Sequence, residues 1–376
     1  MHACAPYVAG VAGAIATGWN IANVGAVATD LSHDYHASLA TVGLFTTAQF
    51  LVHMTLQIPA GRAADRFGAR RVALLAMVVL LVGNALALAA PHVWLALVAK
   101  AVVGLGTGLG FISASDYVRA SGGSPFLQGI YGGASVLSPG AALAVVPALE
   151  GPLGWRSPFA TAAVLAIGVA VLFALAPEAP RTRTRAHADE ATIGVLRDRR
   201  LYRFAVVHTA AFGLSVVIGN WVVTLFQKHG ASHAAAAAAG SLTLLLSFFT
   251  RTWGGWLLRH RVEVMPRAVA VSLATGGAAT IALALPIPFA TGVVAAIVVG
   301  LAAGLPFAPA FAGAAAERPD APGAAVGFVN GCAALAIVAG TPLLGLTFSL
   351  PGHGRIGFAI VGVLWALAAF ATPRRF

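Results

Sequence analysis

The chain has 376 residues, of which 59% are hydrophobic and only 9% are charged. This composition is too apolar for a soluble globular protein. The formal net charge is +11, but a nucleic-acid-binding protein gathers its basic residues on a solvated face, whereas here they punctuate apolar stretches. We therefore expect a multi-pass protein embedded in a lipid bilayer, with no nucleic-acid partner.

Twelve stretches of about 20 apolar residues, bounded by charged residues or by Pro and Gly clusters, predict membrane-spanning helices. The first six are expected at 6–29, 38–60, 71–90, 92–115, 124–148 and 156–176, and the second six at 201–226, 233–258, 264–285, 287–311, 321–347 and 355–372. The segment 177–200 between the two sets is rich in Arg, Pro, Thr and acidic residues. The predicted fold is therefore all-α: a six-helix bundle over 1–176, a cytoplasmic linker over 177–200, and a second six-helix bundle over 201–376.

The distribution of Lys and Arg predicts the orientation in the membrane. With the 177–200 linker and the 61–71 segment assigned to the cytoplasm, 18 basic residues lie on that side, and only Arg156, Lys228 and Arg355 lie on the other. An excess of basic residues marks cytoplasmic loops. Both termini are therefore expected in the cytoplasm, and the membrane is expected to be a plasma (inner) membrane.

The two halves of the sequence repeat each other. Three pairs of segments match at nearly the same offset: 102–109 with 298–305, 57–61 with 251–255, and 129–133 with 327–331. Transporters built from two parallel six-helix units show this kind of internal duplication. The prediction is two bundles related by pseudo-symmetry.

A charged segment separates the second and third apolar stretches: Gly61-Arg-Ala-Ala-Asp65-Arg66-Phe-Gly68-Ala-Arg70-Arg71. Gly61 and Gly68 are expected to let the backbone turn sharply, and Asp65 can accept bonds from Arg or from helix-terminal amides. The pattern Gly-x-x-x-Asp-Arg-x-Gly-x-Arg-Arg resembles the loop signature of the major facilitator superfamily of secondary transporters, which implies a gating role for this segment. An ordinary basic cytoplasmic loop is the alternative.

Further segments extend this resemblance over essentially the whole chain. The segments that begin at Lys100 and Gly129 resemble the family's fourth-helix and fifth-helix motifs, the latter typical of proton-coupled exporters, and Gly154-Trp155-Arg156 resembles the entry to the sixth helix. The resemblance implies a central cavity, walled by the first, fourth, seventh and tenth helices, that opens alternately to either side of the membrane.

One helix resembles a particular branch of this family. Arg251-x-x-Gly254-Gly255 is similar to the eighth helix of the nitrate/nitrite porter and cyanate-type branch, which implies that Arg251 holds an anion. Gln57 stands where nitrate porters have a second Arg, which argues against nitrate itself. The second-half copy of the charged segment also departs from the family, because it has Arg259 where the first half has Asp65.

Ionisable residues inside a membrane span are costly and are functional candidates by default. Arg251 is the candidate anion anchor, because its planar guanidinium binds carboxylates or oxyanions bidentately. Lys100 is a second candidate for substrate binding or coupling, with a bond to interhelical carbonyls as the alternative. His53 and His208 are candidates for a symported proton because histidine titrates near neutral pH, or are hydrogen-bonded within the bundle. No carboxylate is expected beside these groups, so the cavity should be positive and favour anions.

Amide side chains within the spans could add substrate specificity. Asn20 and Asn23 share a face of the first helix because they are three residues apart. The other candidates for lining the cavity are Gln49, Gln57, Asn220 and Asn330. Hydrogen bonding between helices is the alternative role for each of them.

Two motifs resemble ligand-binding sites but are interpreted as structural features. Gly104-Leu-Gly-Thr-Gly-Leu-Gly110 looks like a nucleotide-binding loop but lies inside an apolar span, so close helix packing explains it. Asp30, His33, Asp34 and His36 have metal-ligating side chains, yet a solvated loop is the simpler interpretation. Accordingly, neither a cofactor nor a metal site is predicted.

Together these features predict a monomeric secondary transporter, not an enzyme, that moves a small organic or inorganic anion by alternating access, with proton symport or anion exchange as the coupling. The alternative is a proton-coupled exporter of drugs or metabolites, favoured by the partial fifth-helix motif. The lack of a buried carboxylate argues against it.

Overall fold

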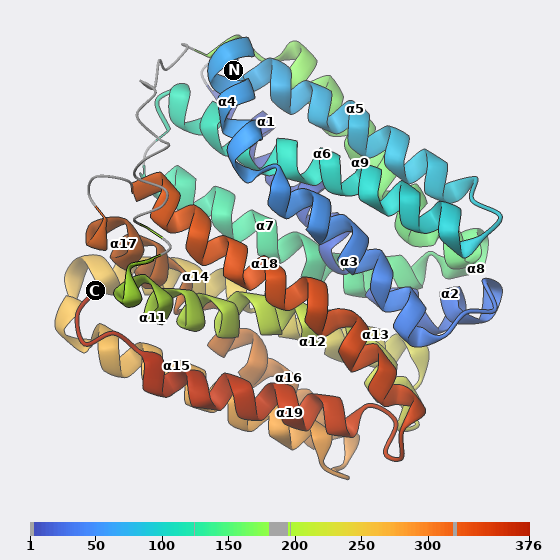
Figure 1. Cartoon of the computed structure of the whole chain (residues 1–376). Helices are drawn as coiled ribbons and strands as arrows, with labels where there is room; N and C mark the ends of the chain where they lie inside the picture. The colour runs from blue at the N-terminus through green and yellow to red at the C-terminus, as the bar shows by residue number, and fades with distance from the viewer. Residues whose placement is uncertain (1–3, 124, 180–194, 196, 319–321) are drawn as a thin grey trace.

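A computed structural model describes residues 4–123, 125–179, 195, 197–318 and 322–376 (Figure 1). The first six spans are built from the following helices: α1 (Ala5–Ala22), η2 (Gly25–Val27) and α2 (Ala28–Asp34); α3 (Leu39–Thr55) and α4 (Gln57–Phe67); α5 (Ala69–Leu88); α6 (Val93–Ala120); α7 (Pro125–Ala148); and α8 (Glu150–Leu153), η3 (Gly154–Arg156) and α9 (Ser157–Leu175). This first bundle matches the predicted spans to within a few residues at most ends.

The second six spans follow the same order. They comprise α11 (Arg199–His208), the π-helical turn η4 (Thr209–Leu214) and α12 (Ser215–Lys228); α13 (His233–Leu245) and α14 (Ser247–His260); η5 (Val262–Val264) and α15 (Met265–Ala284); α16 (Phe289–Gly304) and α17 (Phe307–Glu317); α18 (Pro322–Leu346) and η6 (Thr347–Ser349); and α19 (Arg355–Leu367) and η7 (Ala368–Ala371). Ten helical stretches among the described residues are long and apolar enough to cross a membrane, and Leu39–Thr55 and Arg355–Ala371 are shorter apolar helices. The predicted all-helical fold with twelve spans in two bundles is confirmed.

The two ends of the bundles differ. The start of α1 and the end of η7 lie at one end, which we call the terminal end, whereas α2 and α8 lie at the opposite end, the α8 end (Figure 1). Most of the predicted linker, 180–194 and 196, lies outside the described residues, so the predicted domain boundaries stay predictions.

Several spans are interrupted near the middle or toward one end. The first breaks after Ala22, where a turn and η2 separate α1 from α2. The second span breaks at Leu56, between α3 and α4, and the eighth breaks at Leu246, between α13 and α14. The tenth breaks at Leu305 and Pro306, between α16 and α17, because proline lacks the amide that would continue the helix. The fifth span, α7, continues as a helix through Pro139.

The charged segment corrects one prediction. Gly61 lies inside α4, so the turn predicted there is wrong. The chain reverses only at Gly68, whose φ of 95° falls in the region that favours glycine. Glycine can adopt helical dihedral angles as well as those of a turn, so α4 continues through Gly61 to Phe67.

Glycines bring helices into close contact at equivalent places in both bundles. A Cβ atom at Gly104 would lie 2.3 Å from the carbonyl oxygen of Gln49, and one at Gly300 would lie 2.1 Å from that of Leu242. Such contacts require the absence of a side chain, so α6 packs on α3 as α16 packs on α13. The interpretation of the 104–110 glycines as packing residues is confirmed, because they lie within α6.

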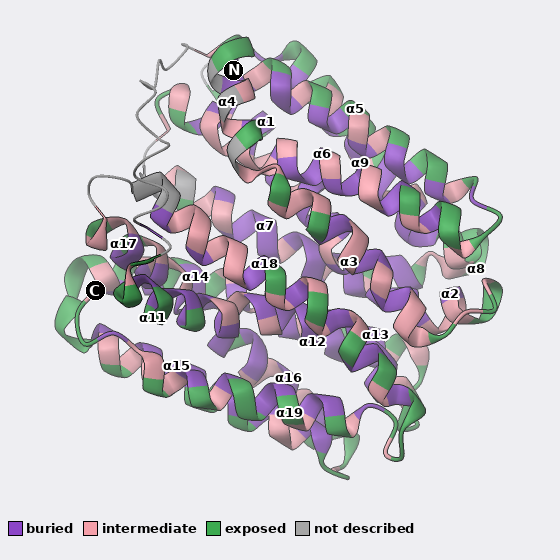
Figure 2. Cartoon of the chain, in the orientation of Figure 1, coloured by how far each residue is buried: buried purple, intermediate pink, exposed green. Residues whose placement is uncertain are grey.

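Exposed residues lie along the outer helices (Figure 2), and many of the exposed side chains are large and apolar. Trp94 is 69% exposed, Leu175 80% and Phe370 86%. An outward-facing apolar surface suits lipid chains, and the helices satisfy their backbone hydrogen bonds internally, as a bilayer requires.

Candidate substrate cavity

A cavity of about 210 Å³ lies between the two bundles. The first, fourth, seventh and tenth spans all contribute to its wall, as the resemblance implied, and four other spans complete it. Its lining residues are Thr17, Gly18 and Ile21 of α1; Gln49, Phe50 and His53 of α3; Gln57 of α4; Thr107, Phe111 and Ile112 of α6; Ser135 of α7; Phe212 of η4; Arg251 of α14; Phe307 and Phe311 of α17; and Val326, Gly327 and Asn330 of α18.

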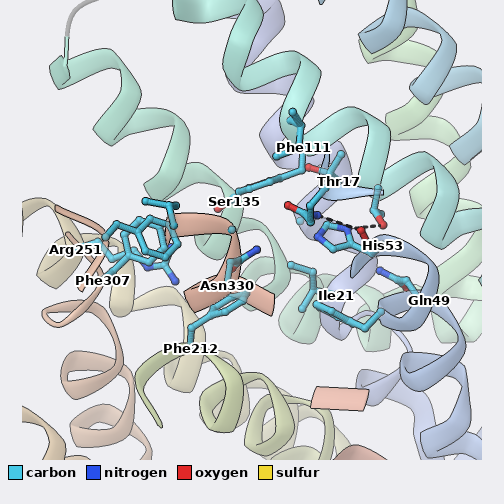
Figure 3. Close-up of a pocket in the computed structure, with 18 residues that line it drawn as sticks. Thr17, Ile21, Gln49, His53, Phe111, Ser135, Phe212, Arg251, Phe307 and Asn330 are labelled. Atoms are coloured by element: carbon cyan, nitrogen blue, oxygen red, sulfur yellow. Dashed lines mark hydrogen bonds between the residues drawn. The ribbon is translucent and has the colours of Figure 1, made fainter. Parts of the chain in front are cut away.

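Arg251 supplies the only full positive charge among these lining residues, and none of them is a carboxylate. Its guanidinium carbon lies 3.9 Å from the ring centroid of Phe307 and 5.5 Å from that of Phe212 (Figure 3). Nη1 donates to the carbonyl oxygen of Gly132 in the first bundle at 3.3 Å, and Nε is buried without a hydrogen-bond partner. Arg251 is therefore held by aromatic faces and retains donor capacity for a ligand.

Polar groups of the first bundle form the opposite wall. His53 Nδ1 lies 3.1 Å from Thr107 Oγ1, and Gln57 Nε2 donates to the backbone oxygen of His53 at 3.1 Å. The Gln49 Oε1 atom is buried without a partner. These groups can donate to or accept from a bound solute, so the wall offers specificity without charge.

Asn330 connects the cavity to His208. The Oδ1 atom of Asn330 lies 3.3 Å from His208 Nε2, and the His208 ring stacks on Phe212 with centroids 5.4 Å apart. His208 is fully buried and does not line the cavity. Its place behind Asn330 makes it a group that reaches the cavity only through that amide.

Other predicted residues lie away from the cavity. Lys100 is buried between α6 and α1, where Nζ donates to the backbone oxygen of Asn20 at 3.4 Å. The Asn20 amide donates to Ala16, and the Asn23 amide donates to Pro158 at 2.9 Å. Lys100 and Asn23 therefore make the interhelical bonds that were their alternative role, and Asn20 does so by accepting from the Asn84 amide of α5 at 3.2 Å.

At the α8 end the two bundles touch. Asn220 of α12 accepts from Thr46 of α3 at 3.0 Å and donates to the backbone oxygen of Ile21 at 3.3 Å. Thr47 donates to the backbone oxygen of Val338 in α18 at 2.7 Å. Asn220 thus joins the bundles rather than lining the cavity, and direct bonds close this end of the interface.

Comparison with known proteins identifies the family. A model described as Major Facilitator Superfamily matches residues 8–341. The chain belongs to the major facilitator superfamily. A search of curated proteins found no relative that matches this sequence. Because the chain belongs to this superfamily of secondary transporters, the cavity is the central cavity of a secondary transporter.

Solved structures agree with this membership at the level of the fold. A D-xylose-proton symporter is 16% identical with a TM-score of 0.76, over 98% of this chain and 97% of that one. The nucleoside transporter NupG is 15% identical with a TM-score of 0.76, over 98% of both chains. A bacterial homologue of the human lysosomal transporter Spinster, in an inward-facing and occupied conformation, is 16% identical with a TM-score of 0.79, over 97% of this chain and 95% of that one. At these identities the likeness extends to the fold alone.

The family's charged segment is anchored to the end of the sixth span. Arg70 donates to the backbone oxygen of Phe173 at 2.9 Å and to Glu178 Oε1 at 2.6 Å, and Arg71 donates to the same carboxylate at 3.1 Å. Hydrogen bonding from Arg70, followed by that from Arg71, lowers the pKa of Glu178. Arg66 is exposed beside the ring of Phe67. The side chain of Asp65 lies outside the described residues, and the gating role stays a prediction.

Sequence reasoning missed the aromatic part of this transporter's cavity. Five phenylalanines line it: Phe50, Phe111, Phe212, Phe307 and Phe311. They carry no polar signal, and the chain has 20 phenylalanines, most of which pack elsewhere. The one available signal was the spacing of Phe307 and Phe311, which places both on one face of the tenth span after its proline break.

Proposed function

We propose that this transporter moves a small organic anion, and that Arg251 binds its carboxylate or oxyanion group. The observation that carries the proposal is a buried guanidinium at a cavity whose lining holds no carboxylate to neutralise it. A buried positive charge without a counter-ion is costly. An anionic ligand would supply that counter-ion, and the free Arg251 Nε would gain a partner. This role agrees with the resemblance of the eighth helix to the nitrate/nitrite porter and cyanate-type branch.

The size and walls of the cavity favour an organic anion over an inorganic one. Its volume of 210 Å³ suits a small solute. Five phenyl rings would pack against an apolar or aromatic body, whereas a strongly hydrated inorganic oxyanion would lose water without replacement contacts. Gln49, Gln57 and Asn330 would bind further polar groups of the substrate.

Alternating access supplies the transport mechanism. In this conformation direct bonds between the bundles close the α8 end, and release of those bonds would expose the cavity to that side. The charge asymmetry supports placing the terminal end in the cytoplasm of a plasma membrane. For a coupling proton, His53 is the better candidate because it lines the cavity while His208 does not. Proton symport through His53 and exchange of one anion for another both fit this arrangement.

Thermal stabilisation of the purified protein tests the proposal. A ligand that binds only the folded state raises stability by about 2.7 kcal/mol at 100 times its Kd, so a panel of small carboxylates, inorganic oxyanions and lipophilic cations can be ranked by their Tm shifts. One class of organic carboxylate is expected to stabilise the wild type. Arg251→Ala should abolish that shift, and Arg251→Lys should weaken it because an ammonium cannot bind bidentately.

A matched control is Lys228→Ala, since Lys228 is exposed and lies outside the cavity lining. This variant should keep the wild-type shift. Stabilisation by lipophilic cations that persists in Arg251→Ala would refute the anion proposal and favour the exporter. Stabilisation by nitrate or cyanate in place of organic carboxylates would instead assign the chain to the inorganic branch.

A further inference from the structure

A cluster of three metal-ligating side chains lies at the α8 end, outside the cavity. Asp30 of α2, Glu150 of α8 and His233 of α13 each present a ligand atom, and these atoms lie within 4.8 Å of one another. Asp30 and Glu150 belong to the first bundle, and His233 belongs to the second. The cluster therefore spans the interface that must open during alternating access.

The contacts within the cluster call for a cation or proton at its centre. A carboxylate oxygen of Asp30 and one of Glu150 lie within 4.8 Å of each other, and two carboxylates this close repel each other unless something positive lies between them. Glu150 Oε2 lies 3.1 Å from His233 Nε2. Glu150 Oε1 is buried without a hydrogen-bond partner, so the cluster has an unused ligand atom.

A second layer of bonds orients the histidine. Nε2 of Gln227 in α12 lies 3.0 Å from His233 Nδ1. Oε1 of the same amide accepts from the Thr29 hydroxyl of α2 at 3.3 Å. Fixing one ring nitrogen in this way aims the other at Glu150. A metal-ligating histidine donates its second N–H to an acceptor, so ligation through Nε2 requires the Gln227 amide, whose Nε2 faces Nδ1 here, to turn and present its oxygen instead.

We propose that Asp30, Glu150 and His233 bind one divalent transition-metal ion of the Zn²⁺ class, and that this ion holds the bundles together at the α8 end. One imidazole nitrogen and two carboxylate oxygens suit Zn²⁺, whose bonds to them are about 2.0–2.2 Å long. A small inward movement of the side chains from their present separation forms the site. Ca²⁺ and Mg²⁺ prefer oxygen ligands only, so they fit less well.

Such an ion would act on the conformational equilibrium. Because one of its three ligands lies on the second bundle, it binds tightly only when the α8 end is closed. A ligand selective for one state shifts the population toward that state. Zn²⁺ at this place would therefore slow alternating access without occupying the cavity, and the effect holds whatever the transported substrate is.

Direct binding to the full-length protein tests the site. Metal-free protein in detergent is titrated with ZnCl₂ at about pH 7.5, where histidine is neutral and able to ligate. The wild type should bind one ion with high affinity, and MgCl₂ should not compete. His233→Asn and Glu150→Gln should each weaken binding at least about tenfold, the loss seen even for residues that merely support a ligand.

Two controls separate this site from adventitious binding and from misfolding. His36 is an exposed histidine at the same end with a φ of 48°, a conformation that asparagine tolerates, so His36→Asn should bind Zn²⁺ like the wild type. The Tm of each variant without metal reports whether it folds. Asp30→Asn provides a second ligand variant if His233→Asn does not fold.

Hydrogen exchange tests whether the ion joins the two bundles, which a binding titration does not show. Zn²⁺ should slow exchange of backbone amides in α8 and in the first turn of α13 together, because the ion joins the two bundles. Protection confined to one bundle would overturn the bridging role. Unchanged affinity in His233→Asn and Glu150→Gln would show adventitious binding and overturn the site itself.

Discussion

Gly25 permits a close approach of the two bundles, and Gly25→Ala should open the α8 end. A Cβ atom at Gly25 would lie 2.5 Å from both the Cα and the carbonyl oxygen of Asn220. Backbone atoms cannot rotate away, so the bundles would have to separate by about 0.9 Å to restore an ordinary contact of 3.4 Å. Overpacking of this kind costs about 1–3 kcal/mol.

That cost falls on the closed conformation alone, because the contact is broken when the α8 end opens. A penalty of about 2 kcal/mol changes the ratio of closed to open molecules by roughly thirtyfold. A transporter that is mostly closed at this end would then populate the open form measurably. Gly25→Ala should therefore move one bundle relative to the other as a unit and leave the helices around Gly25 ordered.

Electron–electron double resonance between two spin labels measures this opening. Asp34 at the end of α2 and Lys228 at the end of α12 are both exposed. Each can be replaced by a cysteine that carries a spin label, once Cys4 and Cys332 are replaced by serine. Gly25→Ala should shift the distance distribution to longer values. The matched control is Gly104→Ala, whose Cβ would lie 2.3 Å from the Gln49 oxygen within the first bundle. Gly104→Ala should lower Tm without changing the distance between the labels. The reasoning would be refuted if both variants lengthened that distance equally, or if Gly25→Ala did not lengthen it.

Two further predictions concern stability. The lowered pKa of Glu178 means that its bonds to Arg70 and Arg71 stabilise the fold above the unfolded-state pKa and are lost as the pH falls through the folded-state pKa. Glu178→Gln should therefore lower the free energy of unfolding near neutral pH by no more than about 1 kcal/mol, because the pair is partly exposed, and match the wild type in strong acid, which Tm measured against pH would show. Trp221 Nε1 donates to the backbone oxygen of Thr341 at 2.8 Å. Because that oxygen lies within α18 and keeps its helical partner, Trp221→Phe should cost about 0.5–1.5 kcal/mol, the net contribution of one hydrogen bond. A Tm equal to that of the wild type would contradict this estimate.

The spans and the duplication could be predicted because the bilayer imposes them. Every span must be apolar and helical, and close helix packing leaves glycines at repeated positions, as at Gly104 and Gly300. Where a side chain faces was not predictable. Lipid outside a bundle is as apolar as the packed interior, so the helix that carries Lys100 has no polar side from which to infer that Nζ lies against α1 and away from the cavity.

A site residue could be predicted from the sequence where its side chain is energetically costly inside a membrane. Arg251 stood out because a charge inside a membrane needs a reason, and the structure places it at the cavity. Glu150 and His233 lie at the ends of spans, where charges are inexpensive, so nothing in the sequence distinguished them. Their neighbourhood arises only when the two bundles meet, and segments 83 residues apart in the chain (150 to 233) give no local signal of that contact.

The contact between Gly25 and Asn220 has a symmetry reason that the sequence does contain. The matched segments of the two halves are offset by 194–198 residues, from 57 to 251 and from 129 to 327, and Gly25 and Asn220 are 195 apart. Each residue is therefore approximately the repeat counterpart of the other. In a two-fold arrangement a residue on the axis meets its own counterpart, so this contact lies close to the pseudo-symmetry axis. Contacts away from the axis occur in equivalent pairs, as α3 on α18 and α7 on α13 do, whereas a contact on the axis has no second copy to compensate for its loss. A methyl group at Gly25 should accordingly act on closure more strongly than one at a glycine in either paired interface.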